Sequence, residues 1–178
     1  MSVGKPSAAL ELPASLAENP DLDRWVRILP DRSVRIGTGK VEMGQGIVTA
    51  LCQIAAEELD LPIQSVRMLS GSSAEGPDER YTTASLSVEV SGASIRLVCA
   101  ELRTRMLEHL ARRLNCALES LSVENGEFLA DGEPTGFDYW RLADEVDLRA
   151  PLQRRPPLKP TADYRLVGRS VARLDLPD

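Results

Sequence analysis

Glycine and glutamine at the predicted start of a helix form the most informative motif in the sequence. Gly44, Gln45 and Gly46 stand directly before residues 47–59, whose apolar side chains recur at helical spacing. Glycine lets the backbone approach a ligand closely, and the unpaired N–H groups of a first helical turn favour anionic groups. The Gln45 amide can both donate and accept hydrogen bonds. The motif therefore predicts either a loop for a polar, phosphate-bearing ligand or only a tight strand-to-helix turn.

Hydroxyl-bearing residues gather at the predicted start of a second helix. Residues 81–87 (YTTASLS) end an unstructured stretch of about fifteen residues and lead into a long helical pattern. A loop of that length in a compact domain usually has a function or is covered by another segment. Small residues at a helix start can present N–H and Oγ groups to an oxygen-rich ligand, although Ser and Thr are also ordinary helix caps. This segment is therefore either a second binding loop or only a cap.

The remaining ionisable residues form no catalytic pattern. His109 is the one histidine, and it is expected to be solvated because arginines surround it on a predicted helix. The pair Glu57-Glu58 is predicted on an exposed helix face, and Asp21 and Asp23 fall in a leader segment. We assign these carboxylates no acid–base role, and we expect no catalytic residue and no metal ligand in this chain.

Composition narrows the class of protein. The chain has 178 residues, of which 43% are hydrophobic and 27% charged, as is typical of a globular domain. A net charge of -6 argues against a nucleic-acid partner, and no apolar run approaches the roughly 18 residues of a membrane span. The chain shows no secretory signal pattern. Because Cys52, Cys99 and Cys116 are widely spaced, we expect no disulfide framework, no Cys/His metal site and a cytoplasmic location.

Periodicity predicts an α+β fold of short β-hairpins and strands with two main helices. Two short apolar runs within residues 25–36, separated by turn residues, predict a hairpin. Residues 47–61 have the spacing of a helix that ends before a proline, and residues 65–70 that of a strand. A long helical pattern covers residues 86–115, with an interruption at Ser91-Gly92.

Turn signals and composition divide the chain further. Asn125-Gly126 lies between two short apolar runs and predicts a second hairpin, while residues 137–146 have the spacing of a short amphipathic helix. Residues 1–23, rich in Pro, Ala and Ser, predict a surface leader that can dock on a partner. Residues 24–150 would form the domain, and residues 151–178 a proline-rich connector that leads into another domain.

From about Trp25 to Leu114 the sequence resembles the molybdenum hydroxylases, the xanthine dehydrogenase and aldehyde oxidase family, in the part of the large subunit that wraps molybdopterin. Residues 39–59 (GKVEMGQGIVTALCQIAAEEL) resemble the family's glycine–glutamine–glycine loop and following helix, and residues 81–95 (YTTASLSVEVSGASI) its second cofactor loop and helix. The leader and the ending are similar to the branch with nicotinate dehydrogenase and isoquinoline 1-oxidoreductase. The resemblance implies a partial molybdopterin-binding domain, followed from residue 151 by the start of a hammerhead-like domain.

The resemblance also implies a set of cofactor-binding residues. Two groups fall on the family's cofactor loops: Met43, Gly44, Gln45 and Gly46 on the first, and Ala84, Ser85 and Ser87 on the second. By resemblance, the Gln45 amide bonds the pterin, and the second loop holds the pterin or its phosphate-bearing tail. The implied cofactor is molybdopterin, with the cytosine dinucleotide as a candidate form, shared with other parts of the enzyme.

Parts of the family's catalytic machinery have no counterpart in this sequence. The family's base is a glutamate near the C-terminus of the large subunit, and neither that segment nor the family's other glycine-rich loop near the metal is present. Three scattered cysteines cannot ligate iron–sulfur clusters. The resemblance therefore implies part of a large subunit that hydroxylates an N-heterocycle or aldehyde, incomplete alone, with the remaining large-subunit segment and an iron–sulfur subunit as partners. The alternative is a non-catalytic module that binds or carries a pterin or nucleotide.

Overall fold

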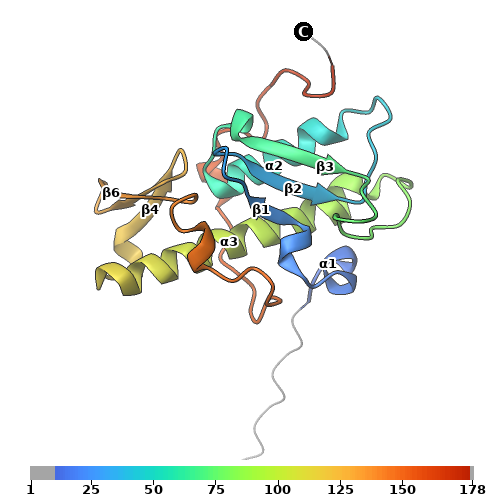
Figure 1. Ribbon diagram of the computed structural model, residues 1–178. Coiled ribbons are helices and arrows are strands. Elements are labelled where there is room, and N and C mark those ends of the chain that lie inside the picture. Colours follow the sequence, from blue (N-terminus) through green and yellow to red (C-terminus); the bar gives the residue numbers. More distant parts are fainter. Residues whose placement is uncertain (1–10, 177–178) are drawn as a thin grey trace, which may run out of the picture.

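A three-stranded sheet with two helices on one face forms the centre of the protein (Figure 1). The computed structural model describes residues 11–176. Strands β1 (Val26–Ile28) and β2 (Val34–Thr38) pair antiparallel, which confirms the first predicted hairpin. Strand β3 (Val66–Ser70), also predicted, lies parallel to β2, and the helix between them supplies the crossover that a parallel pair needs.

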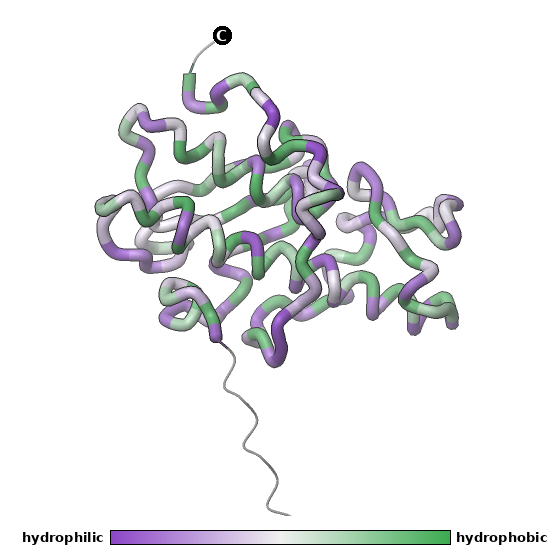
Figure 2. Tube along the Cα trace, turned by 180° about the vertical axis from the view of Figure 1, so that it is seen from behind, coloured by the Kyte–Doolittle hydropathy of each residue, from purple (hydrophilic) through white to green (hydrophobic). Residues whose placement is uncertain are grey.

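Helices α2 (Ile47–Leu59) and α3 (Ala93–Leu114) pack against each other, and both confirm predicted helices. The predicted interruption before α3 is a π-helical turn, Ser87–Gly92, which runs directly into it. A Cβ on Gly92 would lie 3.0 Å from Ile54 Cδ1, so glycine permits the close approach of the two helices. Seen from behind, apolar and polar residues alternate along the helices, as expected of elements with one buried face (Figure 2).

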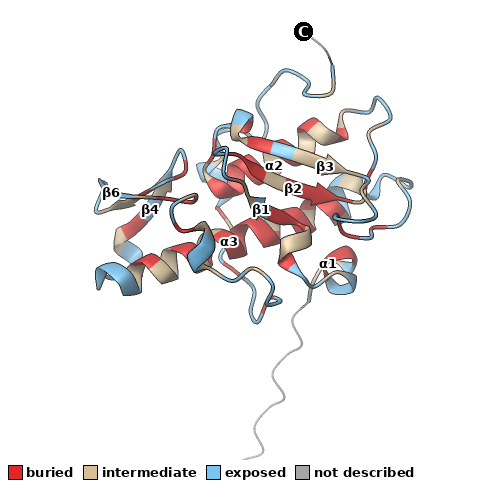
Figure 3. Ribbon diagram, in the orientation of Figure 1, coloured by how far each residue is buried: buried red, intermediate tan, exposed pale blue. Residues whose placement is uncertain are grey.

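Apolar side chains from the sheet, α2 and α3 form one core, and Figure 3 shows in red the buried residues along these elements. Trp25 is the largest fully buried side chain, and its indole Nε1 donates to the Asn19 carbonyl at 2.9 Å, so its polar atom is satisfied. The other large, fully buried side chains are Tyr139, Phe128, Leu16, Leu22, Ile36, Leu51, Leu59, Ile95, Leu102, Met106 and Leu110. Each buried aliphatic side chain of this size stabilises the fold by about 1.5–3 kcal/mol before conformational entropy is subtracted.

The described part of the predicted leader packs on this same domain. Helix α1 (Ala14–Glu18) and a short 3-10 turn (Leu22–Arg24) precede β1. Leu16 and Leu22 are completely buried in the core. A helix of five residues is too short to show periodicity, which is why the sequence pattern does not indicate it. Residues 1–10 of the leader lie outside the described residues.

A second three-stranded sheet lies at the C-terminal end of α3 (Figure 1). Strands β4 (Leu121–Glu124), β5 (Glu127–Ala130) and β6 (Glu133–Asp138) form an antiparallel meander. Asn125 and Gly126 join the first two strands with φ angles of 50° and 83°. Because two consecutive left-handed residues suit a tight hairpin turn, this confirms the second predicted hairpin.

Residues 137–146 do not form the predicted amphipathic helix, and that prediction is wrong. Strand β6 takes the first two of these residues, and only Ala143–Glu145 form a single helical turn, of the 3-10 type. The Tyr139 N–H donates to the Gly126 carbonyl at 3.3 Å, and the Tyr139 ring packs on Phe128 with centroids 5.1 Å apart. Hydrogen bonding and aromatic packing across the second sheet override the short helical spacing.

The C-terminal strap, residues 158–175, runs along α2 and buries two glutamates for which the sequence predicts an exposed face. Glu57 and Glu58 are only 2% and 1% exposed. Lys159 Nζ lies 2.8 Å from Glu57 Oε1, and Arg103 Nη2 lies 2.9 Å from Glu58 Oε1. The prediction of an exposed face is therefore wrong, because cations from the strap and α3 pair with both carboxylates and allow their burial.

Groups that could support metal or thiol chemistry are sparse in the described structure. Within residues 11–176 no three His, Cys, Asp or Glu side chains gather to hold a metal ion. All three cysteines are free, and burial raises the pKa of Cys99 and that of Cys52, the latter to about 12. No helix in the same range combines the length and apolarity of a membrane span.

Candidate functional site

The two sequence motifs lie side by side in the structure. The glycine loop (residues 39–46) leads from β2 into α2, and the hydroxyl loop (residues 81–87) leads into the π-helical turn. The Val41 N–H donates to Thr82 Oγ1 at 2.8 Å. The buried Lys40 ammonium donates to the carbonyl of Tyr81 at 3.0 Å and to that of Glu79 at 2.7 Å. The chain thus brings together two loops that are about forty residues apart in sequence.

A buried carboxylate joins the glycine loop to the π-helical turn that follows the hydroxyl loop. Glu79 is 5% exposed, and its Oε2 accepts hydrogen bonds from the Thr38 hydroxyl at 2.7 Å, the Gly39 N–H at 2.9 Å and the Ser91 hydroxyl at 2.8 Å. These partners lie at the end of β2, in the glycine loop and in the π-helical turn. A Cβ on Gly39 would lie 2.7 Å from the Glu79 nitrogen, so only glycine fits at this crossing. The base of the site is therefore closely packed.

The start of α2 is capped by the chain's own carboxylate. Glu42 Oε1 accepts the N–H groups of Gly44 at 2.8 Å and Gly46 at 2.9 Å, and its Oε2 accepts that of Val48 at 3.0 Å. Partial burial opposes the charge, but these three N–H groups hold the pKa of Glu42 below its usual value. Glu42 thus occupies the position at the helix start where the sequence pattern predicts an anionic ligand.

Gln45 is exposed, and its amide is bonded within the glycine loop. Its Nε2 donates to the Val41 carbonyl at 2.9 Å, and its Oε1 accepts the Met43 N–H. An amide has two N–H donors and two lone pairs, so one of each stays free for a ligand. Gly44 and Gly46 have φ angles of 93° and 77°, in the left-handed region that favours glycine. The loop therefore makes a tight turn and also leaves ligand-binding groups free.

The hydroxyl loop contains strained backbone and does not act as a cap. Ala84 and Ser85 have φ angles of 53° and 58°, a conformation that costs a non-glycine residue about 1–3 kcal/mol and is common at functional sites. No side chain caps the π-helical turn that Ser87 begins. Among the described residues no hydrogen-bond partner engages the hydroxyl of Ser85 or Ser87. These hydroxyls are thus available to a ligand.

Exposed apolar side chains concentrate on the two loops. Of the large apolar residues that are exposed within residues 11–176, five lie on the loops or just after them: Val41, Met43, Tyr81, Leu86 and Val88. Met43 is 69% exposed and Tyr81 84%. Apolar groups that gather at an exposed place mark a binding surface. Together with neutral amide, hydroxyl and backbone groups, they suit a ligand with flat apolar faces and polar edges.

The exposed loop residues of this candidate site carry motifs in the sequence, whereas the residues that hold the two loops together do not. Glu42 could have been found, because an acidic residue beside a helix N-terminus is a known stabilising signal. Lys40, Thr82 and Glu79 give no such local signal, since their contacts cross about forty positions. His109 lies elsewhere, on α3, with its Nε2 2.8 Å from a carboxylate oxygen of Glu145.

Known proteins of one family resemble this chain. The model of the molybdopterin cofactor-binding domain family matches residues 5–173. A nicotinate dehydrogenase subunit of Pseudomonas putida is 35% identical over 157 residues, which are 88% of this chain and 13% of that protein. Xanthine dehydrogenase of Oryza sativa is 31% identical over 124 residues, which are 64% of this chain and 9% of that protein. The chain therefore spans only a small part of the length of these relatives.

Solved structures share the fold. A Cu,Mo-CO dehydrogenase superposes with a TM-score of 0.59 at 23% identity, over 70% of this chain and 17% of that one. Quinoline 2-oxidoreductase from Pseudomonas putida 86 superposes with a TM-score of 0.54 at 27% identity, over 66% of this chain and 15% of that one. Since the family model also matches nearly the whole sequence, this chain belongs to the molybdopterin cofactor-binding domain family, and it corresponds to one segment of its longer molybdenum hydroxylase relatives.

Proposed function

We propose that the glycine loop and the hydroxyl loop form one wall of the molybdopterin site in a molybdenum hydroxylase. The observation that carries the proposal is the way the loops are joined. Lys40 and Thr82 link them side by side, and the Glu79 carboxylate ties the glycine loop to the π-helical turn that follows the hydroxyl loop. Their outward faces then present apolar side chains, free hydroxyls and backbone groups together, which is the mixture that a pterin requires.

The loop residues fit the cofactor in distinct roles. Met43 and its exposed apolar neighbours would contact a flat face of the pterin, and the free N–H and lone pair of the Gln45 amide would bond its polar edge. Ser85 and Ser87 would hold another polar edge or the phosphate-bearing tail, including that of a cytosine dinucleotide form. The bound cofactor supplies the two-electron redox chemistry, and this chain supplies orientation.

In this proposal, substrate binding and turnover depend on other parts of the enzyme as well as on this segment. We propose hydroxylation of an N-heterocycle or aldehyde, together with the remainder of a large subunit and an iron–sulfur subunit. The support is that the relatives carry names that refer to nicotinate, xanthine and quinoline. A cytoplasmic location stays a prediction.

A chimera provides the test. The 178-residue chain would replace the matching segment of the Pseudomonas putida nicotinate dehydrogenase, and molybdenum and pterin would be measured per assembled complex. Gln45→Ala and Ser85→Ala should each weaken cofactor binding by about 1–3 kcal/mol, or roughly 5- to 150-fold. Gln64→Ala and Ser73→Ala are matched controls, because both residues are exposed and lie outside the loops.

The outcomes separate the alternatives. Full cofactor content in both loop variants would refute the assignment of the site. Pterin that stays bound to the isolated chain, without any other part of a large subunit, would favour the carrier module instead.

A further inference from the structure

A row of polar side chains on α2 binds the C-terminal strap. Thr49, Gln53 and Glu57 follow one another at intervals of four residues, so they lie on one face of the helix. Thr49 Oγ1 accepts the Leu174 N–H at 2.9 Å, and Gln53 Nε2 donates to the Leu166 carbonyl at 3.1 Å. The Glu57 carboxylate accepts N–H groups of the strap near its other end. The strap therefore follows α2 back toward the glycine loop.

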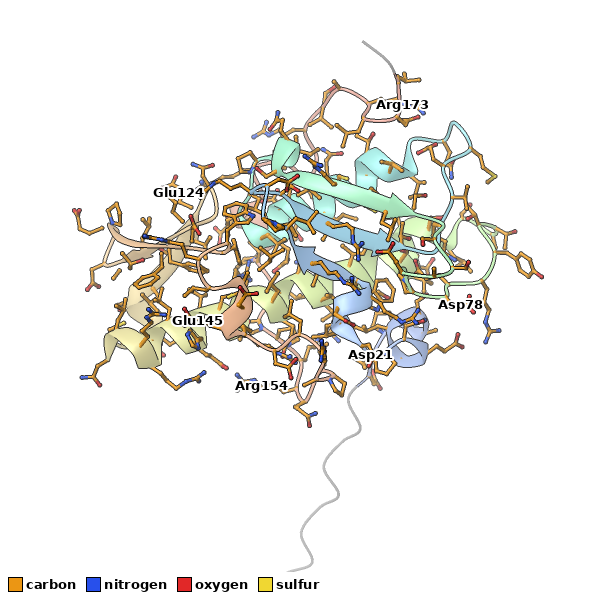
Figure 4. All side chains as sticks on the ribbon, viewed as in Figure 1. Asp21, Asp78, Glu124, Glu145, Arg154 and Arg173 are labelled. Atoms are coloured by element: carbon orange, nitrogen blue, oxygen red, sulfur yellow. The ribbon has the colours of Figure 1, made fainter. Side chains whose placement is uncertain are left out.

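The end of the strap carries Arg173 onto the glycine loop (Figure 4). Its Nη2 donates to the Gly44 carbonyl at 3.0 Å and lies 4.0 Å from Glu42 Oε1, the carboxylate that caps α2. A Cβ on Gly46 would lie 3.6 Å from Arg173 Nε, so the guanidinium covers the loop backbone. The Asp175 carboxylate holds the guanidinium, because it accepts hydrogen bonds from Arg173 Nε at 3.0 Å and from Arg173 Nη2. Among the described strap residues, only Arg173 hydrogen-bonds this loop with its side chain.

We propose that Arg173 is a positioning residue for the glycine loop, through which the C-terminal strap sets the conformation of the cofactor wall. The proposal rests on the proposed function only in calling that loop a cofactor wall. Arginine suits the role because its planar fork can bond Gly44 and Asp175 in different directions at once, whereas a lysine is a single point charge. Without Arg173 the Gly44 carbonyl loses a charged donor, and the Glu42 carboxylate loses a nearby positive charge.

Residue-resolved hydrogen exchange on the full 178-residue chain, followed by NMR, tests the coupling without any cofactor. In Arg173→Gln the amides of Gly44 and Gly46, which Glu42 caps, should exchange at least about fivefold faster than in the wild type. Amides of β2 should keep their rates. Arg169→Gln is the matched control, because Arg169 is an exposed strap residue whose guanidinium bonds no described residue.

Two further variants separate positioning from a purely structural role. Asp175→Asn should also speed exchange at Gly44, but less than Arg173→Gln does, since Arg173 keeps its bond to the loop. Arg173→Lys should restore part of the protection. If Arg173 only fastens the strap, exchange rises at Leu174 and not in the loop, and the proposal is overturned. Equal loop exchange in Arg173→Gln and Arg169→Gln, or faster exchange of every amide including β2, also overturns it.

The cofactor can be tested separately in the chimera. Arg173→Gln should lower pterin content, whereas Arg169→Gln should leave it unchanged. If loop exchange rises in Arg173→Gln while Gln45→Ala keeps full cofactor content, the positioning of the loop stands and the proposed function fails. If loop exchange is unchanged while Gln45→Ala loses cofactor, the proposed function stands and the positioning role fails.

Discussion

Glu57→Gln tests the ion pair and hydrogen bonds that hold the strap on α2. The Glu57 carboxylate accepts the backbone N–H groups of Arg165 at 2.9 Å, Leu166 at 2.6 Å and Val167 at 2.8 Å, and the Lys159 ammonium at 2.8 Å. Burial opposes its charge, but Lys159 and the N–H groups outweigh it and lower the pKa of Glu57 from 4.5 to about 2. Glutamine keeps the shape of the side chain and removes its charge.

The lowered pKa of Glu57 sets both the size and the pH dependence of the stability that Glu57→Gln should lose. Because the folded-state pKa lies below the unfolded one, the carboxylate stabilises the fold above pH 4.5, and this contribution is lost as the pH falls toward 2. The difference corresponds to roughly 3 kcal/mol of unfolding free energy at pH 7, to a smaller amount at pH 4 and to less than half of the pH 7 value at pH 3. We expect Glu57→Gln to lose these amounts.

Urea unfolding of wild type and variant at the three pH values measures the losses. Glu124→Gln is the control, because its carboxylate is 54% exposed and lies 3.5 Å from Arg165, so its loss should stay below about 1 kcal/mol. A loss in Glu57→Gln that is the same at every pH, or no larger than that of Glu124→Gln, would refute the reasoning.

Two further predictions concern the base of the site. Gly39→Ala places a Cβ 2.7 Å from the Glu79 nitrogen and 2.8 Å from the Pro77 carbonyl oxygen, and it should destabilise the fold by about 1–3 kcal/mol; an unchanged melting temperature would contradict this. Glu42→Ala removes the cap of three N–H groups at the start of α2 and should cost about 1–2 kcal/mol. In urea unfolding, a variant as stable as the wild type would show that water replaces the cap without loss.

Local sequence patterns predict those helices and hairpins whose determining residues lie close together in the sequence. Apolar spacing is enough for α2 and α3, and the Asn125-Gly126 turn is enough for the second hairpin. The same spacing fails for Glu57, because Lys159, which buries it, lies 102 residues later in the chain. It also fails for residues 137–146, where bonds across the second sheet decide the conformation.

The sequence proposes the exposed residues of the candidate site, and they stay a prediction, whereas it gives no signal for the residues that support the two loops. Gly44 and Gln45 belong to a motif that the family resemblance identifies, and the structure places that motif beside the hydroxyl loop. Glu79 reaches the glycine loop across 40 residues, and Arg173 reaches Gly44 across 129 residues. Contacts of that span depend on how the whole chain folds, so no local pattern contains them.

The most direct test of the central claim is an experimental structure of the cofactor-loaded chimera. We expect the pterin to contact Met43 and the Gln45 amide on the glycine loop, and Ser85 and Ser87 on the hydroxyl loop. Electron density for a pterin bound elsewhere, with both loops facing solvent, would contradict the assignment of the wall to these loops.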